Sequence, residues 1–241
     1  NTEKKYLFQC YEYLQGETLA QWLHRQEKPL NLDEILPILQ QTALALNAMH
    51  RLEMLHQDIR PKNIMVINAE NAMKIKLIDY GSTAVRGLVE INPKNANRAL
   101  GTLAFMAPEY FIDHSPSVHS DQFSLAVMAY YLFTKQLPYG TDLARCNSLK
   151  QMKKVQYHSI RKYRPDLPIW LDKILGQALS IEPIHRFEAL SELIHNLMHP
   201  SKELLNSKPP AIIERDPLRF WQMSCAVLGL LFLLSIAWPF I

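Results

Sequence analysis

The stretch His56-Gln-Asp-Ile-Arg-Pro-Lys-Asn63 and the segments directly after it decide the fold. Two short apolar runs come next, Asn63-Ile-Met-Val-Ile67 and Lys74-Ile-Lys-Leu-Ile78, with a polar segment between them. Short runs that are rich in β-branched residues are typical of paired strands, so the sequence predicts a β-hairpin. Asp79-Tyr-Gly81 lies directly after the second strand.

This hairpin should bring polar side chains together. A hairpin returns the chain to the point where it began, so we expect Asp58, Asn63 and Asp79 to converge at one end of it. One carboxylate and one amide oxygen can then hold a divalent cation, and hard oxygen ligands of this kind suit Mg²⁺. The second carboxylate can accept a proton. Taken singly, each aspartate is equally well explained as a turn or helix-cap residue.

The composition excludes several classes of protein. The chain has 241 residues, with 26 Lys and Arg against 23 Asp and Glu and a formal net charge of +3. This balance is too even for a nucleic-acid-binding protein, so no nucleic-acid partner is expected. Cys10, Cys146 and Cys225 lie far apart, which argues against a disulfide framework or a zinc ribbon. The sequence has no Gly-rich phosphate loop of the G-x-G-x-x-G or P-loop type.

Residues 1 to about 199 are expected to form one globular unit of the α+β class, mostly helical. An aromatic-rich strand is predicted at Tyr6–Tyr13 and a short helix at Leu19–His24. Asn31-Leu-Asp-Glu34 has the cap-x-x-Glu form of a helix start, although Pro37 should kink this helix or shift its start. Its apolar stripe consists of Ile35, Leu39, Leu46 and Met49. Further helical patterns lie around Ser124–Phe133, Trp170–Leu179 and Phe187–Leu197.

The C-terminus is the clearest break in composition. From Phe220 to Ile241 the sequence has no charged residue. As a helix this run would reach about 33 Å, enough to cross the hydrocarbon core of a bilayer. We therefore expect a transmembrane helix at 220–241 in contact with membrane lipid, preceded by a juxtamembrane linker at 200–219. Basic residues before the run and none after it place the N-terminal part in the cytoplasm; the alternative is a buried core helix.

The residues around Asp58 belong to an ordered series that resembles a protein kinase. The patterns H-R-D-x-x-x-x-N, D-F-G and A-P-E correspond in order to His56-Gln-Asp58 with Asn63, Asp79-Tyr-Gly81 and Ala107-Pro-Glu109. Supporting matches are Gly101-Thr102, Asp121, which resembles the buried aspartate of the following helix, and Arg186, which resembles the arginine that pairs with the glutamate of A-P-E. Several ordered matches together are far more specific than any one alone.

The residues of these motifs, together with Arg215-Asp-Pro-Leu-Arg-Phe-Trp221 before the expected span, resemble those of bacterial membrane-anchored serine/threonine protein kinases. This resemblance implies a single-pass protein of the bacterial inner membrane with a cytoplasmic kinase part. In that group a metal-dependent phosphatase domain often precedes the kinase, so such a domain upstream is a family-level expectation.

The resemblance also implies the reaction, which is transfer of the γ-phosphoryl group of ATP to a Ser or Thr hydroxyl of a protein substrate. Asp58 resembles the catalytic base that accepts the proton of that hydroxyl. Arg60 falls where these kinases usually have a lysine that contacts the transferred phosphoryl group, and arginine can supply the same charge. Thr102 would brace the catalytic loop.

The same resemblance assigns the nucleotide site. Asn63 and Asp79 resemble the ligands of the Mg²⁺ ions that bridge the ATP phosphates. Glu12 and Leu14 resemble the linker residues whose backbone groups hydrogen-bond adenine. Tyr11 resembles the residue that controls access to the pocket behind the adenine. Residues 1–14 would then be the last small-lobe strand and the adenine linker, and residues 15–199 the large lobe.

The sequence departs from the kinase pattern at three places. Gln57 replaces the arginine that docks an activation-loop phosphate, and Tyr80 replaces phenylalanine, which adds only a hydroxyl. The Gly-rich loop and the strand lysine of a small lobe are absent from this chain. We therefore expect the 241-residue chain by itself to be inactive.

Two other functions fit part of the sequence. A pseudokinase or membrane-tethered docking module would use the same fold without phosphoryl transfer, but intact Asp58, Asn63 and Asp79 argue against it. A phosphotransferase acting on small molecules is disfavoured by the segment from Gly101 to Glu109, which looks like a peptide-docking element.

Overall fold

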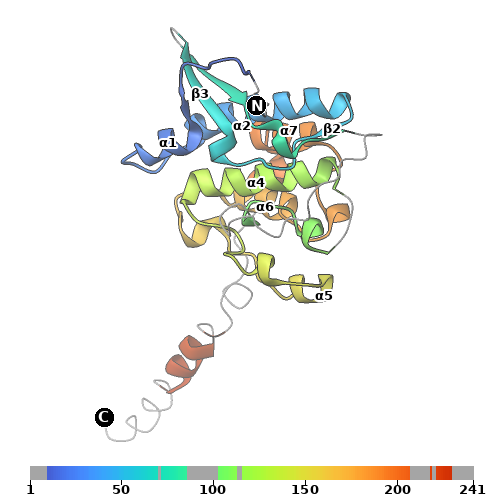
Figure 1. The fold of residues 1–241 in the computed structure, drawn as a ribbon. Coiled ribbons are helices and arrows are strands. Elements are labelled where there is room, and N and C mark those ends of the chain that lie inside the picture. The colour runs from blue at the N-terminus through green and yellow to red at the C-terminus, as the bar shows by residue number, and fades with distance from the viewer. Residues whose placement is uncertain are drawn as a thin grey trace, which may run out of the picture.

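In the computed structural model, the described residues are 10–69, 72–85, 103–112, 116–206, 218 and 221–229. Figure 1 shows a mostly helical fold with a small antiparallel sheet at one end. The helices are α1 (Leu19–His24), α2 (Leu32–Arg51), α4 (Val118–Thr134), α5 (Leu149–Met152), α6 (Ile169–Ala178), α7 (Leu190–Met198) and α8 (Lys202–Leu205). The strands are β1 (Glu17–Thr18), β2 (Met54–Leu55), β3 (Ile64–Ala69), β4 (Ala72–Leu77) and β5 (Ala84–Val85).

The predicted hairpin is confirmed by β3 and β4. These strands are antiparallel, with Ile64 opposite Leu77 and Ala69 opposite Ala72. The open end of the hairpin is closed by a backbone bond in which the Ile78 N–H donates to the Asn63 carbonyl at 2.9 Å. The short strand β1 pairs with the other edge of β3, which gives the strand order β1-β3-β4. A second small sheet, formed by β2 and β5, was not predicted.

Helix α2 begins where the sequence predicts. The Asn31 side chain accepts a hydrogen bond from the Glu34 backbone, and the Glu34 side chain accepts one from the Asn31 backbone, so a complete capping box fixes the start. Pro37 lies inside the helix and does not shift this start, because the cap is satisfied before the proline is reached. The predicted stripe is confirmed, since its members are all buried: Ile35, Leu39, Leu46 and Met49.

Helix α4 is buried on nearly every side and lies in the middle of the fold, between α2 and α6 (Figure 1). It begins at Val118, six residues before the predicted start, with Ser117 as its cap. The apolar pattern missed the first turns because Ser120, Asp121 and Gln122 are polar; all three are buried, as the kinase resemblance implied for Asp121. A helix that is buried all round shows no single apolar stripe from which its start can be predicted.

Helix α1 matches the predicted helix Leu19–His24, whereas α5 was not predicted. Helices α6 and α7 match the predicted helices at Trp170–Leu179 and Phe187–Leu197. Helix α8 lies in the segment expected to be a linker, and its start is capped by Ser201. The predicted strand Tyr6–Tyr13 falls partly outside the described residues, and its described part, from Cys10 on, has no strand structure.

The predicted C-terminal transmembrane helix, and the inner-membrane location that depended on it, are corrected by the structure. Among the described residues, no helix is both long enough and apolar enough to cross a membrane. Of the predicted span, residues 221–229 are described, and they are helical. Residues 220 and 230–241 lie outside the described residues.

Candidate active site

The loop before the hairpin joins two of the predicted site residues by hydrogen bonds. A 3-10 helix at Pro61–Asn63 turns the Asn63 side chain back toward Asp58. Its Nδ2 donates to the Asp58 carbonyl at 2.9 Å and to the carboxylate oxygen Oδ2 at 2.8 Å. Arg60 Nε lies 3.4 Å from the other carboxylate oxygen, Oδ1. The Asp58 carboxylate is therefore oriented by an amide on one side and a guanidinium on the other.

A buried carboxylate from α4 holds the backbone of this loop. Asp121 Oδ2 and Oδ1 accept the backbone N–H groups of His56 and Gln57 at 3.0 and 2.9 Å. His50 Nε2, on α2, lies 2.9 Å from Oδ2 of the same carboxylate. Gln57 has a left-handed backbone with φ of 64°, a conformation that costs energy in a residue other than glycine. The bonds from Asp121 offset that cost, so α4 fixes the turn that leads to Asp58.

His56 is completely buried beneath the site. Burial lowers its pKa below the ordinary value of 6.5, and the nearby negative charges of Asp121, Asp58 and Asp79 only partly oppose this shift. Its ring centre lies 5.6 Å from that of Tyr80. The imidazole is therefore neutral at pH 7 and links the loop before the hairpin to the segment after it by packing.

Asp79 follows the end of β4 and has a left-handed backbone conformation, with φ of 66° and ψ of 73°. Its carboxylate accepts a weak hydrogen bond of 3.4 Å from the Gly81 N–H. The Tyr80 hydroxyl donates to the Leu77 carbonyl at 3.0 Å, a bond that phenylalanine could not make. Because the Ile78 N–H is bonded to the Asn63 carbonyl, Asn63 and Asp79 lie at the same end of the hairpin, as predicted.

A cleft of about 1160 Å³ lies beside this end of the hairpin. One wall is the linker segment Tyr11–Leu14, another is Ile75–Gly81, and Ala45 and Met65 also line the cleft. The structure thus brings Glu12, Leu14 and Asp79 to one cleft. A volume of this size can enclose a nucleotide-sized molecule. Thr102 lies outside the described residues.

The donor set has the chemistry of a magnesium site. Asn63 and Asp79 offer an amide and a carboxylate oxygen, and Mg²⁺ is commonly held by one or two such groups together with waters and phosphate oxygens. Among the described residues, no group of three or more His, Cys, Asp or Glu side chains is arranged to hold a metal ion.

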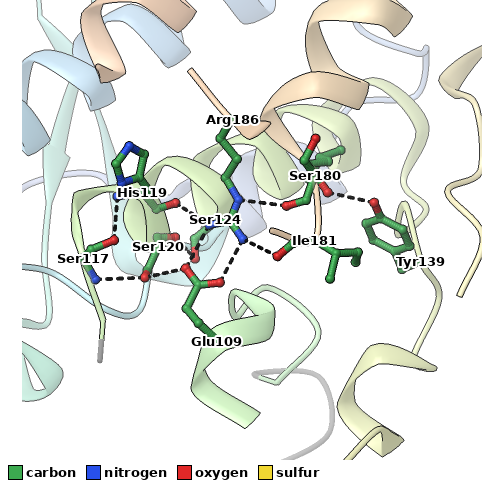
Figure 2. Close-up of polar contacts among 10 residues, drawn as sticks. Glu109, Ser117, His119, Ser120, Ser124, Tyr139, Ser180, Ile181 and Arg186 are labelled. Atoms are coloured by element: carbon green, nitrogen blue, oxygen red, sulfur yellow. Dashed lines mark hydrogen bonds and ion pairs between the residues drawn. The ribbon is translucent and has the colours of Figure 1, made fainter. Parts of the chain in front are cut away.

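The pair formed by Glu109 and Arg186 is confirmed and lies in the core (Figure 2). Arg186 Nη1 and Nη2 donate to the two Glu109 carboxylate oxygens, both at 2.8 Å. The other three guanidinium N–H groups donate to the backbone carbonyls of Ser180, His119 and Ile181. All five donors of the guanidinium are satisfied, which is the condition for such a charge to be stable inside a protein.

This network sets the ionisation of Glu109. Burial alone would raise the pKa of this carboxyl group, but its bonds to Arg186 and to the Ser120 hydroxyl lower the pKa below its ordinary value. Glu109 therefore stays ionised, and it ties the short helix Pro108–Phe111 to α4 and to the loop before α7.

Two polar contacts could not be found from the sequence. Lys76 pairs with Glu12 although 64 residues separate them, and no local pattern indicates such a contact. Asp172 accepts bonds from the Tyr157 hydroxyl, the Ser159 hydroxyl and the Ile160 N–H. This second cluster anchors the loop between α5 and α6 and takes no part in the cleft.

Comparison with known proteins decides the family. The model of the family described as "Protein kinase domain" matches residues 1–200. The chain belongs to this family. Its curated relatives include the serine/threonine-protein kinase PrkC of Bacillus subtilis, 26% identical over 182 residues, which cover 76% of this chain and 27% of PrkC. Pkn3 of Myxococcus xanthus, also a serine/threonine-protein kinase, is 31% identical over 185 residues, covering 75% of this chain and 34% of Pkn3.

The fold agrees with solved kinase structures. The kinase domain of Mycobacterium tuberculosis PknI superposes with a TM-score of 0.58 at 25% identity, over 78% of this chain and 63% of that domain. The matched part of the chain spans only about a quarter to a third of the length of the curated relatives PrkC and Pkn3. The prediction of a bacterial serine/threonine protein kinase is confirmed at the level of the family, and the alternative of a docking module is not favoured.

Proposed function

We propose that this kinase transfers the γ-phosphoryl group of ATP to Ser or Thr hydroxyls of a protein, with Mg²⁺ as the cation. The observation that carries the proposal is the joint position of Asp58, Asn63 and Asp79. Asn63 and Asp58 share a 2.8 Å hydrogen bond. Asp79 follows β4 at the same end of the hairpin as Asn63 and lines the cleft. Phosphoryl transfer depends on positioning and charge neutralisation, and this end of the hairpin supplies groups for both.

Each group has a separate part in this proposal. The Asp58 carboxylate, oriented by Asn63, accepts the proton of the substrate hydroxyl. Arg60 stabilises the negative charge on the phosphoryl group in transit, and Thr102 braces the loop. When Mg²⁺ is bound, it neutralises the charge of the phosphates; Asn63 and Asp79 would hold it.

The cleft receives the nucleotide in this proposal. The backbone of Glu12 and Leu14 offers hydrogen-bonding groups to the adenine, and the apolar side chains on the β4 wall exclude water from one face of the base. Residues 1–14 belong to the last small-lobe strand and the linker, and residues 15–199 to the large lobe. The remaining small lobe, and a phosphatase domain where one exists, are partners expected upstream in the full-length gene product.

The test compares three variants of the full-length gene product with labelled ATP, Mg²⁺ and a general protein substrate. Asp79→Asn should nearly abolish transfer. Asp58→Asn should lower kcat by roughly 10²- to 10⁴-fold, the usual worth of a positioned base, with a smaller effect on nucleotide affinity. The matched control is Asp142→Asn, a surface aspartate whose side chain is 65% exposed, which should keep wild-type kcat. Full turnover in either site variant would contradict the assigned roles.

A further inference from the structure

The linker segment 10–15 forms one wall of the cleft although it has no regular secondary structure. It has no ladder of strand hydrogen bonds to fix its distance from the opposite wall, β4. Whatever holds the linker against β4 therefore sets the width of the cleft. Two of the contacts that hold the linker to the sheet lie among the described residues: one with β3 at the end of the linker, and one with β4 in its middle.

The first contact is at Gly16, where the linker ends and β1 begins. A Cβ atom added to Gly16 would overlap the Val66 carbonyl oxygen, so the backbone can approach β3 this closely only without a side chain. The strand pairing of Glu17 with Val66 comes directly after it. This end of the linker is thus fixed to the sheet by backbone alone.

The second contact is the ion pair between Glu12 and Lys76. The Lys76 ammonium donates to both carboxylate oxygens, at 2.8 and 3.0 Å. Lys76 stands on β4 and Glu12 on the linker, and both line the cleft. The pair therefore bridges the two walls of the cleft, with side chains that are 47% and 72% exposed.

We propose that Lys76 is a positioning residue for the nucleotide, because its ion pair with Glu12 holds the linker at the distance from β4 that adenine requires. This inference rests on the proposed function. Lys76 takes no part in the transfer itself: it orders the linker backbone before ATP arrives, so that less conformational entropy is lost on binding. Its loss should weaken ATP binding and leave the chemical step unchanged.

The experiment measures KM for ATP and kcat of the full-length gene product. Lys76→Met should raise KM roughly two- to fivefold, the range expected for an exposed ion pair, with kcat unchanged. Lys74→Met is the matched control, because Lys74 lies on the same strand two residues away and is also exposed; it should leave KM unchanged. The charge-reversed double variant Glu12→Lys/Lys76→Glu should recover most of the affinity that Lys76→Met loses.

Salt supplies a second measurement. Calorimetric binding of adenosine, which carries no charge, should differ between wild type and Lys76→Met at 0.1 M NaCl and become equal at 1 M NaCl, because salt screens an exposed pair. An unchanged KM in Lys76→Met, or an equal rise in Lys74→Met, would overturn this inference and leave the proposed function standing. Absence of phosphoryl transfer in the wild-type protein would instead overturn the proposed function.

Discussion

Replacing Arg186 by methionine should cost this protein a large part of its stability. Methionine keeps much of the apolar length of the side chain, whereas the guanidinium with its five hydrogen bonds is lost. The Arg186 side chain is completely buried and that of Glu109 is 5% exposed. The variant therefore leaves a buried carboxylate without its cationic partner, although the Ser120 hydroxyl still donates to it, and three backbone carbonyls lose their donor.

The burial of this ion pair determines how much stability the variant loses. Removing one partner of a buried ion pair typically costs about 3 to 5 kcal/mol, because the other charge stays in the core. In a domain of this size each kcal/mol corresponds to roughly 2 to 4 °C in Tm, so Tm should fall by about 6 to 20 °C. Since ordinary domains are stable by only about 5 to 15 kcal/mol, the variant should be folded but marginal.

The loss should also depend on pH in a defined direction. In the wild type the pKa of Glu109 lies below its ordinary value of 4.5, so its stabilising contribution is present above about pH 4.5 and is lost as the pH falls below that value. Without Arg186, its hydrogen bonds and positive charge no longer outweigh the effect of burial, so the pKa of Glu109 should rise. The stability difference between wild type and variant should therefore be largest at pH 7 and shrink as Glu109 becomes protonated.

Urea unfolding followed by circular dichroism at pH 7 and pH 4 measures both effects. Lys153→Met is the matched control, because Lys153 forms an ion pair of the same 2.8 Å length with Glu182 at the surface; it should leave unfolding unchanged within error. The double variant Arg186→Met/Glu109→Leu should recover part of the loss, since no charge then stays buried. If Arg186→Met cost no more than Lys153→Met, or if the loss were independent of pH, the reasoning would be refuted.

Two further predictions concern the loop before the hairpin. Because Gln57 stands where an arginine would bind an activation-loop phosphate, phosphatase treatment should leave the activity of the full-length gene product unchanged; a large drop that rephosphorylation restores would contradict this. Because burial lowers the pKa of His56, the contribution of its neutral ring is fully present above about pH 6.5 and lost as the pH falls further. Wild type should therefore lose stability between pH 7 and pH 5 more steeply than His56→Phe, as measured by urea unfolding at each pH.

The sequence predicts best where short-range chemistry decides the structure. The capping box at Asn31 and Glu34 starts α2 at the predicted place in spite of Pro37, because both bonds of the box are formed within four residues. The β3–β4 hairpin was likewise predictable, since its strands are neighbours in the chain. The closeness of Asn63 and Asp79 is then a consequence of the hairpin and needs no further information.

Prediction failed where burial is decided by distant parts of the chain. The first turns of α4 were missed because their polar residues gain partners far away in the sequence: Asp121 binds the backbone N–H groups of His56 and Gln57. An uncharged run at the C-terminus was interpreted as a membrane span on composition alone, whereas no helix in the described part of the chain is long and apolar enough to cross a bilayer.

Short-range and long-range contacts have different parts in forming the site. The groups proposed for the chemistry, Asp58, Asn63 and Asp79, come from one hairpin and the loop before it, so a local motif can specify them. The groups that hold the surrounding segments, Asp121 for the loop before the hairpin and Lys76 for the linker, lie 60 or more residues from their partners. A chain could therefore keep every motif residue and still bind ATP more weakly after a change at Lys76, because the motif specifies which groups are present and the long-range contacts determine where the surrounding segments are held.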